Sequence, residues 1–101
     1  MSEEILHRRG NYLVRCQTLR PGEATPWYRD PYRRLAVVLS GDALKIEFRD
    51  GTSKEFGVSP GQTDWDEPSE RVHRGVNIGR RIYEEVTVFF LDRPDAVPQP
   101  T

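Results

Sequence analysis

The sequence predicts an all-β fold, and three observations lead to that prediction. No window shows a sustained period of about 3.6 residues in its apolar side chains, which argues against long helices. Short runs rich in β-branched and aromatic residues are typical of strands instead. Turn-forming residues separate these runs at a spacing that suits a sandwich or barrel, at Pro21-Gly22, Ser40-Gly41-Asp42, Asp50-Gly51, Pro60-Gly61 and Asn77-Ile78-Gly79.

Four runs have the composition expected of strands, in residues 12–19, 34–39, 44–48 and 82–91. Residues 12–92 are therefore expected to form the barrel. Residues 1–11 form an N-terminal extension, and the proline-rich residues 93–101 form a loose C-terminal tail. No repeat or linker divides the chain, so a single domain is expected.

The strand register of the hairpin around Asp50-Gly51 can be predicted. A two-residue loop would place Lys45 opposite Phe56 and mix the two faces of the hairpin. A three-residue loop of residues 49–51, with Gly51 left-handed, places Leu44 opposite Phe56 and Lys45 opposite Glu55. Cross-strand pairs favour apolar with apolar and opposite charges together, so the three-residue loop is expected.

Composition excludes several classes of function. The chain has 101 residues, of which 36% are hydrophobic and 31% charged, and a formal net charge of -1. That balance is typical of a folded single domain and argues against a nucleic-acid binder. No segment approaches the roughly 20 apolar residues of a membrane span, and the N-terminus lacks the apolar run of a signal peptide. A cytoplasmic protein without a membrane or nucleic-acid partner is expected.

Two segments of the chain each carry a motif of glycine, proline and polar residues at fixed spacing. The first extends from Gly22 to Gly41 and has Tyr28, Asp30 and Arg34 between them, and the second extends from Gly61 through His73. In this arrangement the chain resembles the cupin family, small jelly-roll barrels also described as RmlC-like or as double-stranded β-helices. The resemblance covers about residues 12–92. The first segment matches the family's spacing to the residue, whereas the second carries an extra residue before Pro68.

The resemblance implies where a metal site would lie and also that it is degenerate. Family members bring three His and one Glu together inside the barrel, and the matching positions here are Tyr28, Asp30, Arg34 and His73. Metal ligands must offer lone pairs, which the positive Arg34 cannot do, and Asp30 with His73 gives only two good donors. No metal and no cofactor is therefore expected.

Without a metal, this quartet has two interpretations. An Asp beside a His is a general-base pair, and a nearby Tyr can act as the acid. Metal-free sugar epimerases of similar barrel fold use such residues, so His73, Asp30 and Tyr28 are candidate catalytic residues of an isomerase or epimerase on a small polar substrate. The favoured interpretation is that Asp30 forms an ion pair with Arg34, because a buried unpaired guanidinium is costly, and that His73 bonds elsewhere.

A third possibility is binding without turnover. Arg34 could hold a small carboxylate or sugar-like ligand, with Trp27 and Trp65 stacking on it near the cavity mouth. The competing interpretation is that both tryptophans simply fill the barrel end. The leading functional expectation is a metal-free small-molecule-binding or accessory protein, and the isomerase is the alternative.

Self-association is also expected. Residues 35–39 and 86–91 are apolar on both faces, whereas a strand with one wet face should alternate. Either these strands are covered by the chain itself or they form a subunit interface. Small cupins are commonly dimers through an outer sheet face, so the resemblance favours a homodimer.

Overall fold

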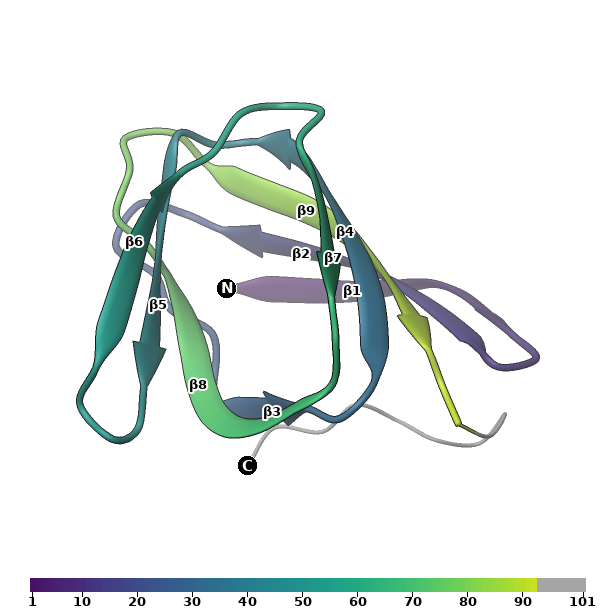
Figure 1. Cartoon of the computed structure of the whole chain (residues 1–101). Helices are drawn as coiled ribbons and strands as arrows, with labels where there is room; N and C mark the ends of the chain where they lie inside the picture. The colour runs from purple at the N-terminus through teal and green to yellow at the C-terminus, as the bar shows by residue number, and fades with distance from the viewer. Residues whose placement is uncertain (93–101) are drawn as a thin grey trace.

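A computed structural model describes residues 1–92, and those residues fold into two antiparallel sheets that face each other (Figure 1). The all-β jelly-roll prediction is confirmed. The nine strands are β1 (Ser2–Arg9), β2 (Tyr12–Leu19), β3 (Tyr28–Asp30), β4 (Arg33–Ser40), β5 (Ala43–Phe48), β6 (Ser53–Gly57), β7 (Thr63–Asp66), β8 (Ser69–Asn77) and β9 (Tyr83–Phe90).

The five-stranded sheet has the order β1-β2-β9-β4-β7, and the four-stranded sheet has the order β3-β8-β5-β6. The chain passes repeatedly from one sheet to the other, so segments distant in sequence become neighbours. The last strand, β9, lies between β2 and β4 at the centre of the larger sheet. This topology closes the two sheets around an interior space.

Several expected strands agree with the structure, and others were not foreseen. The run 12–19 coincides with β2, and the runs 34–39, 44–48 and 82–91 correspond to β4, β5 and β9 with small differences at their ends. Residues 1–11, expected to form an extension, contain strand β1, which pairs with β2 at the edge of the five-stranded sheet. The predicted tail, 93–101, lies outside the described residues.

The predicted hairpin register is confirmed. Leu44 lies opposite Phe56 and Lys45 opposite Glu55. The loop is closed by the Phe48 amide, which donates to the Thr52 carbonyl at 2.8 Å, and Gly51 has a φ of 96°. A residue with a side chain would be strained there, which explains the glycine.

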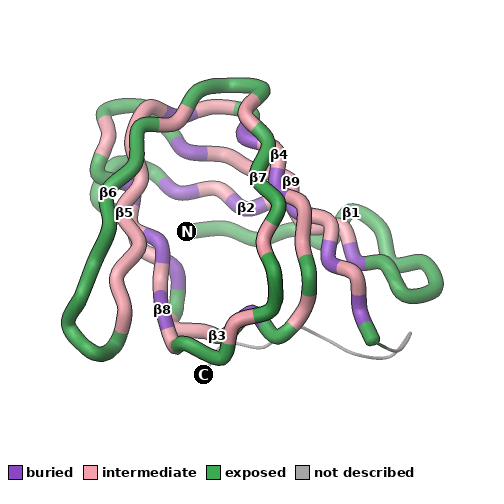
Figure 2. The backbone as a smooth tube through the Cα atoms, in the orientation of Figure 1, coloured by how far each residue is buried: buried purple, intermediate pink, exposed green. Residues whose placement is uncertain are grey.

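Two small apolar clusters hold the sheets together. One contains Leu13, Phe89 and Leu91, and the other contains Leu19, Val38 and Tyr83. The buried residues follow β2, β4, β8 and β9, whereas β1 and β6 are exposed (Figure 2). The second cluster also explains Gly41, because a Cβ there would approach the Tyr83 ring to 2.9 Å.

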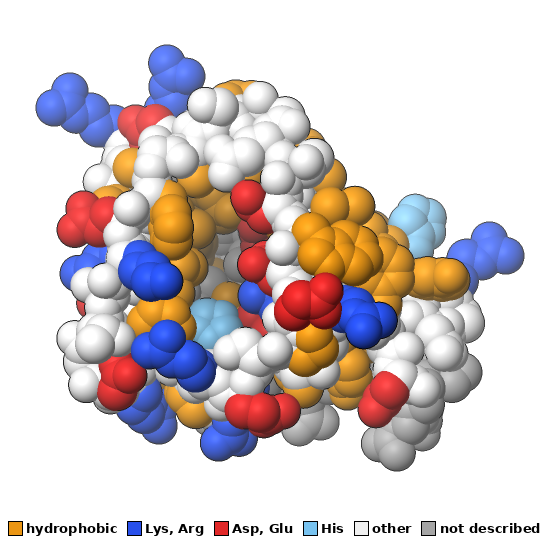
Figure 3. Space-filling view, in the orientation of Figure 1, with side chains coloured by type: hydrophobic (Ala, Val, Ile, Leu, Met, Phe, Trp, Pro, Cys, Tyr) orange, Lys and Arg blue, Asp and Glu red, His pale blue; other side chains and the backbone are white. Residues whose placement is uncertain are grey.

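The five-stranded sheet has an apolar outer face, which we call the outer apolar face. It is defined by the alternate residues that point away from the barrel: Val14, Leu35, Val37, Val86, Val88, Phe90 and Trp65. Hydrophobic side chains are visible beyond β7 in the space-filling view (Figure 3). Within residues 1–92, no helix is long and apolar enough to cross a membrane.

Candidate functional site

The two sheets enclose a cavity of about 420 Å³ that opens to solvent. One part of the wall is apolar and comes from β5, β6 and the residue after β6, whereas β3 and β8 of the same sheet contribute Asp30 and His73. In the space-filling view the hollow has hydrophobic side chains on one side and charged side chains on the other (Figure 3). The apolar wall consists of Leu44, Ile46, Phe48, Phe56 and Val58.

The opposite wall is polar and comes from the inner face of the five-stranded sheet. Strand alternation sends every second residue of β2, β4, β7 and β9 inward. On these strands the inward positions that line the cavity are mostly charged or hydrogen-bonding: Arg15, Gln17, Arg34, Asp64, Asp66, Glu85 and Thr87.

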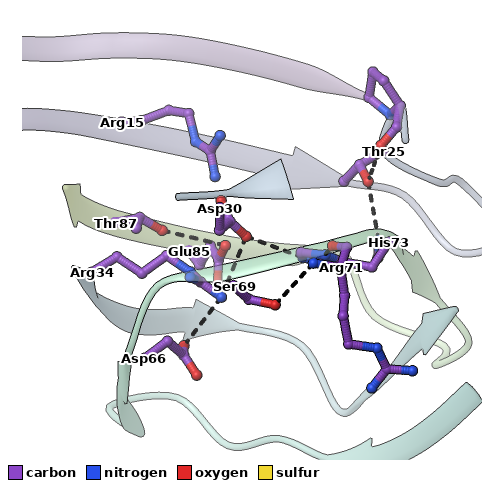
Figure 4. A network of polar contacts seen from close by, with 12 residues as sticks. Arg15, Thr25, Asp30, Arg34, Asp66, Ser69, Arg71, His73, Glu85 and Thr87 are labelled. Carbon is purple, nitrogen blue, oxygen red and sulfur yellow. Dashed lines mark hydrogen bonds and ion pairs between the residues drawn. The ribbon is translucent and has the colours of Figure 1, made fainter. Parts of the chain in front are cut away.

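Asp30, at the end of β3, is the hub of a buried ionic network (Figure 4). Its Oδ2 lies 3.1 Å from His73 Nε2 and 3.3 Å from Arg34 Nη2, and the residue is only 2% exposed. Arg34 also approaches Asp66, at 3.8 Å. The expected Asp30–Arg34 ion pair is therefore confirmed. The expectation that His73 would then bond elsewhere is wrong, because one carboxylate serves both cations.

His73 has an acceptor on each side of its ring. Nε2 faces the Asp30 carboxylate, and Nδ1 lies 2.8 Å from the Arg71 carbonyl oxygen. Both acceptors are satisfied together only when the ring carries two protons. Although burial lowers the pKa of His73, the hydrogen bonds to Asp30 and to the Arg71 carbonyl outweigh it and raise the pKa overall. The geometry therefore favours an imidazolium with no free lone pair.

Tyr28 completes the quartet. It lies opposite His73 on the neighbouring strand, and the two ring centroids are 4.4 Å apart. Burial, followed by the charge of Asp30, raises the pKa of the Tyr28 hydroxyl well above its ordinary value. Tyr28, Asp30, Arg34 and His73 are thus brought together as the resemblance implied.

Of the two tryptophans, Trp65 lines the cavity and Trp27 does not. The ring centroid of Trp27 lies 5.0 Å from the guanidinium carbon of Arg49 and 4.6 Å from that of Arg74. Trp65 sits on β7 at the rim, with its ring 5.3 Å from that of Phe90 and its Nε1 donating to Glu67. The Phe90 contact assigns the Trp65 ring to the outer apolar face.

Sequence reasoning missed the polar wall, and Gln17, Glu85 and Tyr83 in particular. Glu85 accepts hydrogen bonds from the Tyr83 hydroxyl at 2.6 Å and the Thr87 hydroxyl at 3.3 Å. A signal was present in both central strands. The inward positions of β2 read Leu13, Arg15, Gln17, Leu19, and those of β9 read Tyr83, Glu85, Thr87, Phe89, so a polar pair is flanked by bulky residues in each.

Known structures share this architecture. A cupin domain from Bordetella pertussis matches 87% of this chain and 90% of its own, with 18% identity and a TM-score of 0.77. A conserved protein with a double-stranded β-helix domain from Klebsiella pneumoniae matches 97% of this chain and 84% of its own, with 17% identity and a TM-score of 0.72. The chain has the cupin fold.

More distant matches to this cupin fold include an oxalate oxidase solved in complex with the substrate analogue glycolate. It is 20% identical with a TM-score of 0.63, and the match covers 86% of this chain and 45% of that one. No family model matches the sequence, and a search of curated proteins returned no match. At these identities the comparisons establish the fold.

The metal that the cupin resemblance implies does not fit the residues present. A cation would have to sit among Arg34, a protonated His73 and an Asp30 oxygen that both of them already engage. Within residues 1–92, no group of three His, Cys, Asp or Glu side chains could hold a metal ion. The site is a degenerate one whose ligand positions have become an internal ion network.

Proposed function

We propose that this protein binds a small organic molecule in its barrel cavity, without a metal. The observation that carries the proposal is the cavity of about 420 Å³, which has one apolar and one polar wall. Ligand sites are typically concave, of this order of size and mostly apolar with a few placed polar groups. A barrel that served only as a scaffold would gain stability by filling this space with side chains.

The state of His73 supports binding over catalysis. A general base must present a lone pair to the substrate, and the partner carboxylate normally holds only the opposite nitrogen. Here the Arg71 carbonyl occupies Nδ1 and Asp30 occupies Nε2. An imidazolium held in this way can neither take a proton nor turn toward a substrate without breaking a hydrogen bond.

The rival function is a metal-independent isomerase or epimerase acting through His73, Asp30 and Tyr28. The 3.1 Å distance between His73 Nε2 and Asp30 Oδ2, and the contact of Tyr28 with the imidazole, favour it. It requires that His73 leave the Arg71 carbonyl in the substrate complex. A pH–rate profile that depends on His73, measured on a substrate found by binding, would establish this alternative.

The test of binding is a fragment screen by ligand-observed NMR, with a variant that blocks the cavity. Ile46 lines the cavity, and Lys45 next to it on β5 points to the outside. We expect Ile46→Trp to abolish binding of the hits and Lys45→Trp to preserve it, with circular dichroism confirming that both variants fold. Failure of every fragment, or equal binding by Ile46→Trp, would overturn the proposal.

A further inference from the structure

The polar wall carries a second feature, which rests on the proposed function and narrows the ligand class. We infer that the cavity binds a small organic monocation, an ammonium group on an apolar body, with the ammonium placed at Glu85 and Gln17. Three observations carry this inference: a cavity-lining amide without a protein hydrogen bond, carboxylates without a cation, and an apolar wall opposite them.

The amide is that of Gln17. This residue is 5% exposed and lines the cavity, yet its side chain makes no hydrogen bond to any residue that the structure describes. Asn77, equally buried, shows the contrast: its amide donates to the Leu19 and Arg81 carbonyls and accepts from the Gly79 amide. The Gln17 amide is not among the buried unpartnered groups but lines the cavity, so it offers an oxygen and two N–H groups to a ligand there.

The carboxylates are those of Glu85 and Asp64. Glu85 is the cross-strand neighbour of Gln17, and it accepts hydrogen bonds from the hydroxyls of Tyr83 and Thr87. Asp64 accepts from the Gln62 amide at 3.2 Å. No basic side chain within residues 1–92 forms an ion pair with either carboxylate. Burial, and then the charges of Glu85 and Asp64, raise the pKa of the Tyr83 hydroxyl, which indicates that both carboxylates lie near it.

The two arginines of the polar wall, in contrast, are already paired, whereas Lys54 on β6 lines the cavity without an ion pair among residues 1–92. Arg15 Nη1 bonds Glu3 at 2.9 Å, and Arg34 bonds Asp30 and Asp66. The donors these two residues have left over, Arg15 Nε and Arg34 Nη1, are buried away from the solvent and thus from a ligand in the cavity. An anionic ligand would therefore compete with carboxylates that already hold the guanidinium groups.

The charge count of the lining agrees. Three basic side chains and His73 line the cavity, Arg15, Arg34, Lys54 and His73, against five carboxylates, Asp30, Asp64, Asp66, Glu67 and Glu85. The lining carries a surplus of negative charge in either protonation state of His73, which favours a cationic ligand. Leu44, Ile46 and Phe48 on the opposite wall then provide an apolar surface for the rest of the ligand.

The inference can be tested by titrating benzylamine, cyclohexylamine and butylamine into the protein by calorimetry or NMR. Benzyl alcohol, benzoate and glucose serve as the neutral, anionic and polyol probes. We expect the amines to bind about tenfold or more tightly than the neutral and anionic probes, because a charge-assisted hydrogen bond contributes that much. Glu85→Gln should remove this preference. Gln17→Leu should weaken amine binding by a smaller factor than Glu85→Gln does.

Glu84→Gln is the matched control, since Glu84 lies on the same strand and faces outward, where it bonds Thr18. It should bind amines like the wild type. Tighter binding of benzoate or glucose than of the amines, or an unchanged affinity in a folded Glu85→Gln, would overturn the inference and leave the proposed function standing. Absence of binding by every amine, acid, alcohol and sugar would overturn the inference, and a negative fragment screen as well would overturn the proposed function too.

Discussion

In the middle of the five-stranded sheet, the two faces have the reverse of the usual polarity. A sheet with one solvated face normally turns apolar side chains inward and polar ones outward. Here the inward face carries Arg15, Arg34 and Glu85 in its middle, whereas the outward face is lined by valines, leucines and aromatic rings. The difference teaches that the middle of the inner face is organised around a cavity, while the outer face leaves apolar side chains that no other strand of residues 1–92 covers.

Stability and binding are separated along the same strands. On β2 and β9 the bulky inward residues Leu13, Leu19, Tyr83 and Phe89 lie at the strand ends, where the two apolar clusters form. The polar pairs lie between them. The core is thus divided into two apolar clusters, one at each end of these strands, and the cavity lies between them.

The largest effect on stability is expected from the loss of the Asp30 carboxylate, which pairs with two cations of the inner face. Asp30→Asn leaves Arg34 and His73 buried without their carboxylate, so we expect the free energy of unfolding to fall by about 3–5 kcal/mol. Asp66→Asn is the control, because Asp66 is half exposed and its carboxylate lies 3.8 Å from Arg34 Nη2. This variant should lower the free energy of unfolding by less than about 1 kcal/mol. Urea denaturation measures both. Equal losses in the two variants would show that Asp30 is not the hub.

The next effect concerns the outer apolar face. We propose that two copies of the chain associate through it, because monomers rarely expose a contiguous apolar surface of this kind. Val88→Glu places a charge at its centre and should weaken the dimer by about 100-fold in Kd. Sedimentation velocity at tens of micromolar measures this. A wild type that sediments as a monomer would contradict the proposal.

A smaller effect is expected from pH. Because the pKa of His73 is raised in the folded protein, its contribution to stability is complete below about pH 6.5 and is lost as the pH rises through the folded value. The free energy of unfolding should therefore decline over that window in the wild type more than in His73→Gln. Asp30→Asn should reduce the decline as well. Identical pH profiles for wild type and His73→Gln would mean that the ring is neutral.

The smallest effect tests whether the polar middle of the inner face matters for stability. Thr87 is buried and donates a long hydrogen bond, 3.3 Å, to Glu85. Thr87→Val should change the free energy of unfolding by about 1 kcal/mol or less. The free energy of amine binding, measured in parallel, should change more than the free energy of unfolding. A loss of several kcal/mol would show that this polar row holds the sheet together.

The sequence carried much of the fold because local rules determine it. Turn residues marked the strand ends, and charge and apolar pairing determined the register of the 44–57 hairpin. The motif spacing brought Tyr28, Asp30, Arg34 and His73 to one place. What it could not give was the sharing of Asp30 by Arg34 on β4 and His73 on β8, or the contact of His73 with the Arg71 carbonyl within β8, because both depend on the side-chain rotamers. Trp27 was misplaced because the face of an aromatic residue in an irregular segment has no periodic signal.

The positions of the two tryptophans have an optical consequence. Trp65 is 55% exposed and its ring contacts that of Phe90, so its emission should respond when a second surface covers the outer apolar face. Trp27 directly precedes β3 of the other sheet and contacts the guanidinium groups of Arg49 and Arg74, so its indole reports on the loop of the 44–57 hairpin. Variants that keep only one of the two tryptophans therefore provide two intrinsic fluorescent probes, one beside each sheet, without any added label.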